Sequence, residues 1–105
     1  TPLYLAPELL AGERPSPISD LWSLALVLFE AIAGRHPLPS STVTRTLRAV
    51  ASANIPALRT MRPDVPQSVD DLFGRLLARD SLARPQSAAQ MVEQLDRVLH
   101  LVRSS

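Results

Sequence analysis

The sequence predicts an all-α fold in which five helices are arranged around one central apolar helix. Between Asp20 and Gly34 only Ser23 and Glu30 are polar. A helix that is apolar nearly all round must be enclosed by other elements, and this run is shorter than the ~20 apolar residues that a bilayer-spanning helix needs. Three later stretches carry apolar residues at helical spacing, and no stretch alternates strictly between apolar and polar residues. We therefore expect the rest of the chain to pack around residues 20–34.

Residues 1–19 are predicted to form an extended segment, a short helix and a loop. Pro2 and Pro7 disfavour helix at the residue that precedes each of them. Pro7 suits the first turn of a short helix, where Glu8 interacts favourably with the positive end of the helix dipole. Gly12 is expected to end this helix.

The central helix at residues 20–34 and the helix after it both have recognisable ends. Ser19 or Asp20 can cap the central helix, and Gly34 is expected to stop it. A peripheral helix follows, with a thin apolar stripe and three candidate caps. The stripe is Val43, Leu47 and Val50, and the candidate caps are Ser40, Ser41 and Thr42.

Residues 54–67 are predicted as an ordered loop, because prolines occupy positions 56, 63 and 66. Three apolar side chains are expected to pin this loop to the core, namely Ile55, Leu58 and Met61.

The last third of the chain predicts two amphipathic helices, each preceded by a capping-box pattern. Residues 68–71 (Ser-Val-Asp-Asp) and residues 87–90 (Ser-Ala-Ala-Gln) are these patterns. The apolar face of the first helix is Val69, Leu72, Phe73, Leu76 and Leu77. The stripe of the second is Ala88, Met91, Leu95, Val98 and Val102.

The composition excludes several classes of protein. Of the 105 residues, 46% are hydrophobic and 20% charged, which is not the composition of a disordered tail. A net charge of +1 gives no general electrostatic argument for nucleic acid or an anionic membrane. Without Cys there is no thiolate metal site, disulfide or Cys nucleophile, and His36 and His100 lack metal-ligand spacing. No signal peptide or transmembrane helix is predicted, and all basic residues are Arg, which hints at a GC-rich bacterial coding sequence.

Four polar positions stand out from the apolar pattern: Glu8, Asp20, Arg84 and the pair Thr1 and Tyr4. Taken one at a time, their ordinary explanation is a solvated charge or hydroxyl in a loop. For Trp22 and the neighbouring aliphatic residues the ordinary explanation is core packing. Only the order and spacing of these residues together point to a function.

Three motifs carry that order. Residues 1–8 read Thr-Pro-Leu-Tyr-Leu-Ala-Pro-Glu, residues 20–24 read Asp-Leu-Trp-Ser-Leu, and residues 76–85 contain Leu-Leu-Ala-Arg-Asp followed by Ala-Arg-Pro. They resemble, in the same order, the end of a protein kinase activation segment, the opening of the kinase F helix and the turn before the last helix of the catalytic domain. The resemblance covers essentially the whole chain and implies the distal part of a C-lobe, whose parent domain is α+β.

The resemblance implies structural roles for four residues. In kinases the glutamate matching Glu8 pairs with the arginine matching Arg84, which ties the activation-segment helix to the turn before the last helix. The aspartate matching Asp20 accepts hydrogen bonds from the backbone of the catalytic loop and so holds that loop on the F helix. Trp22 belongs to the F-helix motif and is expected in the core.

The resemblance also implies a substrate site at the start of the chain. The threonine matching Thr1 lies beside the catalytic aspartate and helps to position the acceptor hydroxyl. Leu3 and Tyr4 match the floor that receives the substrate residue after the phosphorylated one. The Thr-Pro-x-Tyr form resembles Ser/Thr kinases, so protein substrates are the expected partners.

The residues that handle ATP in this family do not occur in the sequence. It has no Gly-rich loop, no Val-Ala-x-Lys lysine, no His-Arg-Asp catalytic loop and no Asp-Phe-Gly aspartate. Phosphoryl transfer depends on these groups, so we expect no catalytic, cofactor or metal residue in this chain. ATP and Mg²⁺ are expected to act in a parent kinase whose missing upstream regions precede Thr1, consistent with a chain that begins without Met.

Three hypotheses follow. The first is a cytoplasmic fragment of a Ser/Thr protein kinase. A membrane anchor of the parent protein would lie in regions outside this sequence, and this segment is expected to contact neither membrane nor nucleic acid. The second is a non-catalytic module, either a pseudokinase remnant or a helical interaction domain. The third, a small helical nucleic-acid binder, is disfavoured by the near-neutral charge and the Pro-rich connections.

Overall fold

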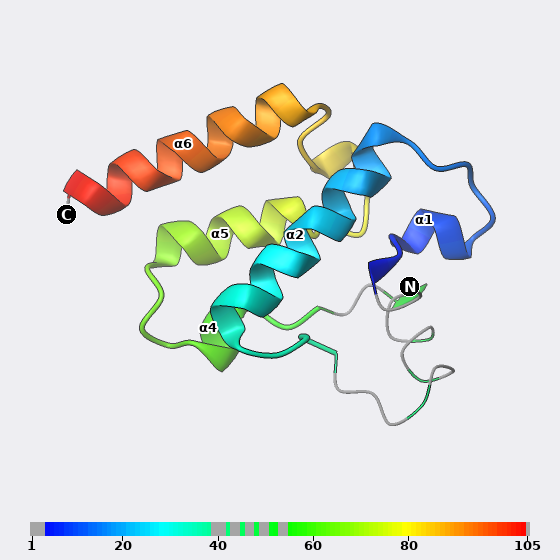
Figure 1. Cartoon of the computed structure of the whole chain (residues 1–105), viewed down its shortest axis with the longest axis horizontal. Helices are drawn as coiled ribbons and strands as arrows, with labels where there is room; N and C mark the ends of the chain where they lie inside the picture. The colour runs from blue at the N-terminus through cyan, green and yellow to red at the C-terminus, as the bar shows by residue number, and fades with distance from the viewer. Residues whose placement is uncertain are drawn as a thin grey trace.

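The computed structural model describes residues 4–38, 42, 45, 48, 51–52 and 55–104. These residues form helices and no strand, which confirms the all-α prediction (Figure 1). The α-helices with described bounds are α1 (Pro7–Leu10), α2 (Pro17–Ala33), α4 (Leu58–Met61), α5 (Gln67–Leu76) and α6 (Ala88–Ser104), with a 3₁₀ helix η2 (Ser81–Ala83) between the last two. Residues 45, 48, 51 and 52 are helical as well. The structure therefore extends the last helix beyond residue 102, to Ser104.

Helix α2 begins at Pro17, ahead of both predicted caps. The cap is Ser16, whose hydroxyl accepts from the Ser19 backbone N–H at 3.3 Å while the Ser19 hydroxyl accepts from the Ser16 N–H at 2.8 Å. Pro17 has its φ preset for the first helical position and needs no N–H there, which favours this earlier start. The predicted end is confirmed, because Gly34 adopts φ 86° and donates its N–H to the Glu30 carbonyl.

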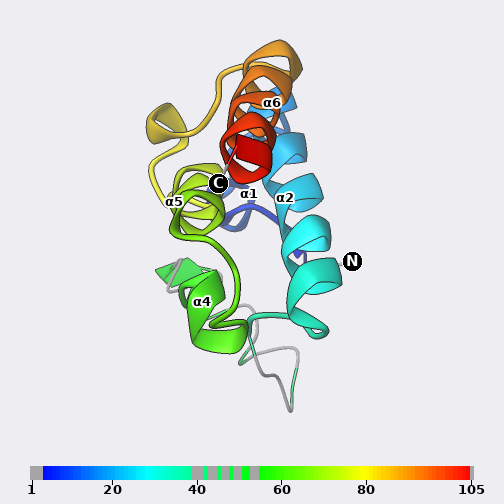
Figure 2. The same ribbon diagram turned by 90° about the vertical axis from the view of Figure 1, so that its left-hand side faces the viewer.

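One face of α2 forms the centre of the core. Trp22, Ala25, Leu26 and Phe29 are buried against residues of α4, α5 and α6. Figures 1 and 2 show α6 crossing above both α2 and α5. The opposite face is not enclosed by the described residues, since Leu24 and Val27 are 47% and 49% exposed. The expectation of a fully surrounded helix is therefore wrong for this chain taken alone.

The segment predicted as a loop over residues 54–67 contains the short helix α4. The cap of its first turn comes from another helix: the Asp70 carboxylate on α5 accepts a hydrogen bond from the Arg59 backbone N–H at 3.2 Å. Leu58 is fully buried, and Ile55 and Met61 pack on the core, so the predicted pinning of this segment is confirmed.

Helices α5 and α6 bury the faces that their spacing predicts. Leu72, Phe73, Leu76 and Leu77 are buried from the first, and Met91 and Val98 from the second, although Ala88 is exposed. The capping box predicted at residues 68–71 is wrong: α5 begins after Pro66 with no side-chain cap, and the Asp71 carboxylate accepts from the Gln67 side-chain amide. At the second box the Ser87 hydroxyl accepts from the Gln90 N–H, but the Gln90 side chain accepts from Gln86.

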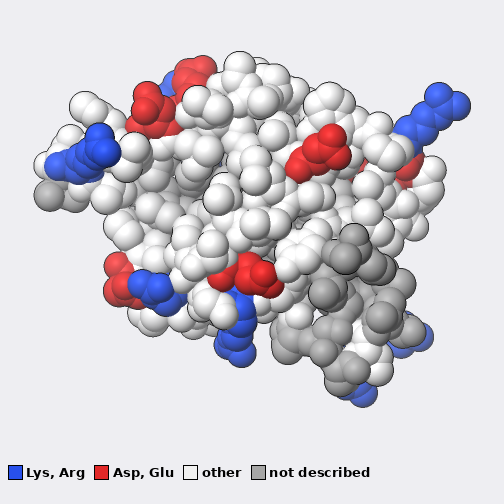
Figure 3. All heavy atoms as spheres, in the orientation of Figure 1, with Lys and Arg blue, Asp and Glu red and all other residues white. Residues whose placement is uncertain are grey.

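The peripheral helix predicted over residues 43–50, with Val43, Leu47 and Val50 and the caps Ser40 and Ser41, lies mostly outside the described residues. Of the candidate caps, Thr42 is described, and its hydroxyl accepts from the Arg45 backbone N–H at 3.2 Å. No helix in the described part of the chain is long and apolar enough to cross a membrane. On the face drawn in Figure 3, acidic and basic side chains are interspersed.

Candidate functional site

The site that the structure builds most completely is a cluster of Glu8, Trp22 and Arg84. Glu8 lies in the first turn of α1, after Pro7 at the first helical position. Trp22 points from α2 into the core and is fully buried. Arg84 follows η2, in the connection between α5 and α6. Residues of α1, of α2 and of the α5–α6 connection thus meet at one point.

Arg84 makes a complete set of contacts in this cluster. Its two terminal nitrogens donate to the two Glu8 carboxylate oxygens at 2.8 and 2.9 Å. Its Nε donates to the Ala78 carbonyl at 2.7 Å, and Nη2 also donates to the Arg79 carbonyl at 3.1 Å. The guanidinium carbon lies 4.7 Å from the Trp22 ring centroid, within the range of a cation–π contact. Arg84 is only 3% exposed, so these contacts replace its hydration.

Two opposing effects act on the Glu8 carboxyl. Burial favours its neutral form and raises its pKa, whereas the Arg84 hydrogen bonds and charge, together with a backbone hydrogen bond, lower it. The outcome is a pKa below the ordinary value, so Glu8 is ionised at neutral pH. The two residues therefore form a bidentate ion pair in which Arg84 is buried and Glu8 is partly buried.

Tyr4 occupies a second cluster, on the other flank of α2. Its hydroxyl donates to the Glu30 carboxylate, with 2.9 and 2.8 Å to the two oxygens, and its carbonyl accepts from the Ser23 hydroxyl at 2.6 Å. The His36 ring meets the Tyr4 ring edge-on, with 5.3 Å between centroids. The hydrogen bond to Glu30, then burial and the Glu30 charge, raise the pKa of Tyr4. Tyr4 is thus fixed to α2 through both its backbone and its side chain.

Sequence reasoning gave no role to Glu30, although a signal was present. Ser23 and Glu30 are the two polar residues of the apolar run, and their spacing of two helical turns places them on the same face. Both bind Tyr4 in the structure.

The other predicted site residues lie apart from these clusters or outside the described residues. Asp20 lies in the first turn of α2 and is exposed, and within the described ranges no group hydrogen-bonds its carboxylate. It does not cap the helix, contrary to the prediction, because Ser16 does so. Thr1 and Leu3 lie outside the described residues.

The arrangement of helices matches the fold of two solved structures. It superposes on the twitchin kinase region from C. elegans with a TM-score of 0.78 and 23% identity, over 88% of this chain and 16% of that one. It also superposes on the autoinhibited serine kinase domain of the giant muscle protein titin with a TM-score of 0.77 and 22% identity, over 89% of this chain and 29% of that one. At these identities the likeness shows the fold.

Sequence comparison gives the family. A family model described as the protein kinase domain matches residues 1–95. The chain is 32% identical over 88 residues to the Serine/threonine-protein kinase PrkC of Bacillus subtilis, covering 84% of this chain and 14% of that protein. It is 33% identical over 84 residues to the Serine/threonine-protein kinase ULK3 of Mus musculus, covering 80% of this chain and 18% of that protein. The chain belongs to the protein kinase domain family.

The chain spans only 14% of the length of PrkC and 18% of the length of ULK3. The relatives come from bacteria, fungi and mammals, so a bacterial source stays a prediction.

The residues of this chain do not fit ATP and Mg²⁺ in the manner of the family. The sequence contains no lysine to pair with phosphates, and neither a His-Arg-Asp nor an Asp-Phe-Gly motif. Within the described ranges, no three His, Asp or Glu side chains gather closely enough to hold a metal ion. No step of phosphoryl transfer is therefore assigned to residues of this chain.

Proposed function

We propose that this chain is the distal part of the C-lobe of a Ser/Thr protein kinase, and that it supplies the substrate-docking floor and the scaffold beneath the active site. The parent protein would transfer the ATP γ-phosphate to Ser or Thr hydroxyls of protein substrates. The observation that carries this proposal is the Glu8–Arg84 pair over Trp22, because it ties α1 to the α5–α6 connection across 76 residues of sequence. The relatives named as Ser/Thr protein kinases support the same activity for the parent.

In this proposal the Tyr4 cluster is the anchored end of the docking floor. Ser23 and Glu30 of α2 both hydrogen-bond Tyr4, so the proposed docking floor would begin at a residue that is fixed to this helix. Leu3 and Tyr4 would receive the substrate residue after the phosphorylated one, and Thr1 would lie beside the catalytic aspartate of an upstream segment. Asp20, exposed on α2, is left available to accept hydrogen bonds from the catalytic loop.

The proposed partners are protein substrates and the upstream regions of the kinase domain. Nucleic acid and membrane are not proposed as partners of this segment, and a cytoplasmic location is proposed for it. The upstream regions would cover the exposed face of α2 around Leu24 and Val27.

The 105-residue polypeptide alone is expected to show no phosphotransfer, because the groups that position and neutralise the phosphates are absent from its sequence. The measurement is transfer of radiolabelled γ-phosphate from ATP·Mg²⁺ to a generic Ser/Thr substrate, with an active kinase as positive control. Labelling of the substrate above a reaction without protein would contradict the prediction.

A non-catalytic module, either a pseudokinase remnant or a stand-alone helical domain, is the second candidate. It is favoured by one observation: α2, α5 and α6 share a core built from this chain's own residues. The sequence of the gene upstream of Thr1 separates the two. Intact His-Arg-Asp and Asp-Phe-Gly motifs would support the kinase, and eroded ones the pseudokinase. A start codon directly before Thr1 would support the stand-alone module.

The isolated chain is expected to self-associate through the exposed face of α2, because a helix face that lacks its cover presents contiguous apolar surface. Replacing Leu24 and Val27 by Ser should shift the sedimentation profile towards monomer. Leu82→Ser is the matched control, since Leu82 is 78% exposed but lies in η2. A wild-type chain that is monodisperse and unfolds cooperatively would instead favour the independent module.

A further inference from the structure

His36 follows closely on Gly34, the residue that ends α2, and its ring contacts the ring of Tyr4. The two rings meet edge-on, with 5.3 Å between their centroids and 68° between their planes. Both residues are half-buried. Aromatic pairs in this geometry attract each other beyond the area that they bury. The contact therefore adds a third support to Tyr4, beside its hydrogen bonds with Ser23 and Glu30.

This third support acts on a motion that the hydrogen bonds leave unrestrained. A tyrosine ring rotates about its Cβ–Cγ bond, and the hydroxyl oxygen lies on that axis, so the oxygen keeps its place while the ring turns. The hydrogen bond from the Tyr4 hydroxyl to Glu30 and the one that its carbonyl accepts from Ser23 are therefore compatible with many ring orientations. A neighbour at the side of the ring, as His36 is, favours one of them.

The His36 ring is itself held in place by the chain that follows it. Its Nδ1 accepts a hydrogen bond from the Leu38 backbone N–H at 3.1 Å. Pro37, between the two, has a φ fixed by its own ring, and both Pro37 and Leu38 are buried. The imidazole cannot turn away from Tyr4 without giving up this hydrogen bond. A rigid turn thus positions the side chain that orients the Tyr4 ring.

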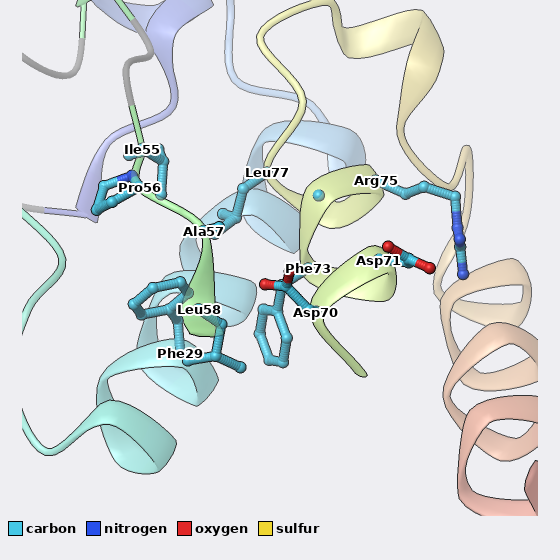
Figure 4. Close-up of a pocket in the computed structure, with 11 residues that line it drawn as sticks. Phe29, Ile55, Pro56, Ala57, Leu58, Asp70, Asp71, Phe73, Arg75 and Leu77 are labelled. Carbon is cyan, nitrogen blue, oxygen red and sulfur yellow. The ribbon is translucent and has the colours of Figure 1, made fainter. Parts of the chain in front are cut away.

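This arrangement is separate from the pocket of about 380 Å³ between α4 and α5 (Figure 4). At the rim of that pocket Asp70 caps α4 and also accepts from the Gln67 amide. The Arg75 side chain extends towards α6, where its Nε lies 3.4 Å from the Gln94 oxygen. These polar groups fasten the helices to one another, whereas His36 acts on a residue of the proposed substrate floor.

We propose that His36 is a positioning residue: it fixes the ring of Tyr4 and so sharpens the selection of the substrate residue that follows the phosphorylated Ser or Thr. The inference rests on the proposed function, in which Tyr4 receives that substrate residue. With the imidazole in place, the ring presents one shape to the substrate. Without it, the ring turns about its own axis while the hydroxyl stays on Glu30, so the floor discriminates less between substrate residues.

The test uses the full-length protein that carries this chain and a peptide library with one Ser or Thr acceptor and mixed flanking residues. The residue after the acceptor is fixed in turn as Ala, Leu, Phe or Asp, and the readout is the relative transfer of radiolabelled phosphate to the four sets. This selectivity profile is a ratio, so a variant that is merely less well folded labels all four sets less and leaves the profile unchanged.

His36→Asn removes the ring but keeps an acceptor for the Leu38 N–H, because an Asn side chain bonds to the backbone two residues further on. The preference between the best and the worst set should fall about threefold, the contribution of one aromatic edge contact. The apparent KM for ATP should not change, since the motifs that bind ATP are absent from this sequence.

Three further variants show whether the effect passes through the Tyr4 ring. His36→Phe keeps an aromatic ring beside Tyr4 and should restore most of the preference. His100→Asn makes the same chemical change at the exposed histidine on α6 and should leave the profile as it was. In a Tyr4→Leu background, His36→Asn should have no further effect on the profile.

An active parent enzyme whose profile is unchanged by His36→Asn, or in which the effects of the Tyr4 and His36 substitutions simply add, overturns this inference and leaves the proposed function standing. A parent protein that labels none of the four sets overturns the proposed function, and the role of His36 with it.

Discussion

Replacing Arg84 by Ala is expected to destabilise the domain by about 3–5 kcal/mol, the cost of leaving a buried charge without its partner. The substitution removes both hydrogen bonds to the Glu8 carboxylate and the contacts with the Ala78 and Arg79 carbonyls. It also removes the cation over the Trp22 ring. Glu8→Ala should have a comparable effect. It leaves the guanidinium of Arg84, a residue that is 3% exposed, with the Ala78 and Arg79 carbonyls as its acceptors and no carboxylate.

Arg97→Ala is the matched control. Arg97 also pairs with a glutamate, Glu93, but at i,i+4 on α6 with both side chains more than half exposed. Such surface pairs contribute about 0.3–0.5 kcal/mol. The measurement is the urea midpoint and slope of the domain that contains the chain. Equal midpoints for Arg84→Ala, Glu8→Ala and Arg97→Ala would refute the structural role of the pair.

Replacing both partners separates the pair's net contribution from the cost of breaking it. Glu8→Met combined with Arg84→Met leaves no unpaired charge, and it should recover a large part of the stability lost by either single substitution. A double variant as unstable as the sum of the singles would mean that the two residues act independently.

Acidification tests the same pair without a mutation. Because the folded pKa of Glu8 lies below its ordinary value of 4.5, the stability that Glu8 contributes is complete above that value and is lost as pH falls through the folded pKa. Glu8→Gln should flatten this loss below about pH 4.5. Asp64 titrates in the acid range too, since hydrogen bonds from Arg62 lower its pKa to about 2, so Asp64→Asn is the reference background. An acid limb that is identical with and without Glu8 would contradict the assignment.

Trp22→Ala is expected to cost about 3–5 kcal/mol, the usual loss when a large buried aromatic residue is truncated. Trp22 is 0% exposed at the centre of the core, and its ring supports the Arg84 guanidinium. Trp22→Phe should cost only about 1–2 kcal/mol. Phe keeps an aromatic face for Arg84, and the Trp22 Nε1–H that it removes is buried with no hydrogen-bond partner among the described residues.

Leu82→Ala provides the baseline for this second prediction, because Leu82 is exposed and should change stability by less than about 0.5 kcal/mol. Urea midpoints of the three variants, with near-ultraviolet circular dichroism to follow the core, form the measurement. A Trp22→Phe variant as unstable as Trp22→Ala would contradict the expectation that loss of the indole N–H costs little.

Features that depend on a few neighbouring residues were predictable from the sequence. The apolar run of α2, its end at Gly34, and the apolar faces of α5 and α6 all follow from spacing along one helix. The order of the three kinase-like motifs was enough for the family, which the match over residues 1–95 confirms.

Apart from the Glu8–Arg84 pair, which the family resemblance implied, the polar contacts could not be predicted, because a side chain finds its partner through space and not along the chain. Asp70 has no role in a capping box that begins at Ser68, yet its carboxylate caps α4 at Arg59, eleven residues earlier in the sequence. Glu30 had no local partner and binds Tyr4, 26 residues away. The sequence was enough to predict α1, α2, α5, α6 and the family, because their signals are local, but not α4. The packing of the helices sets where each charge is buried, and so which charges hold the domain together.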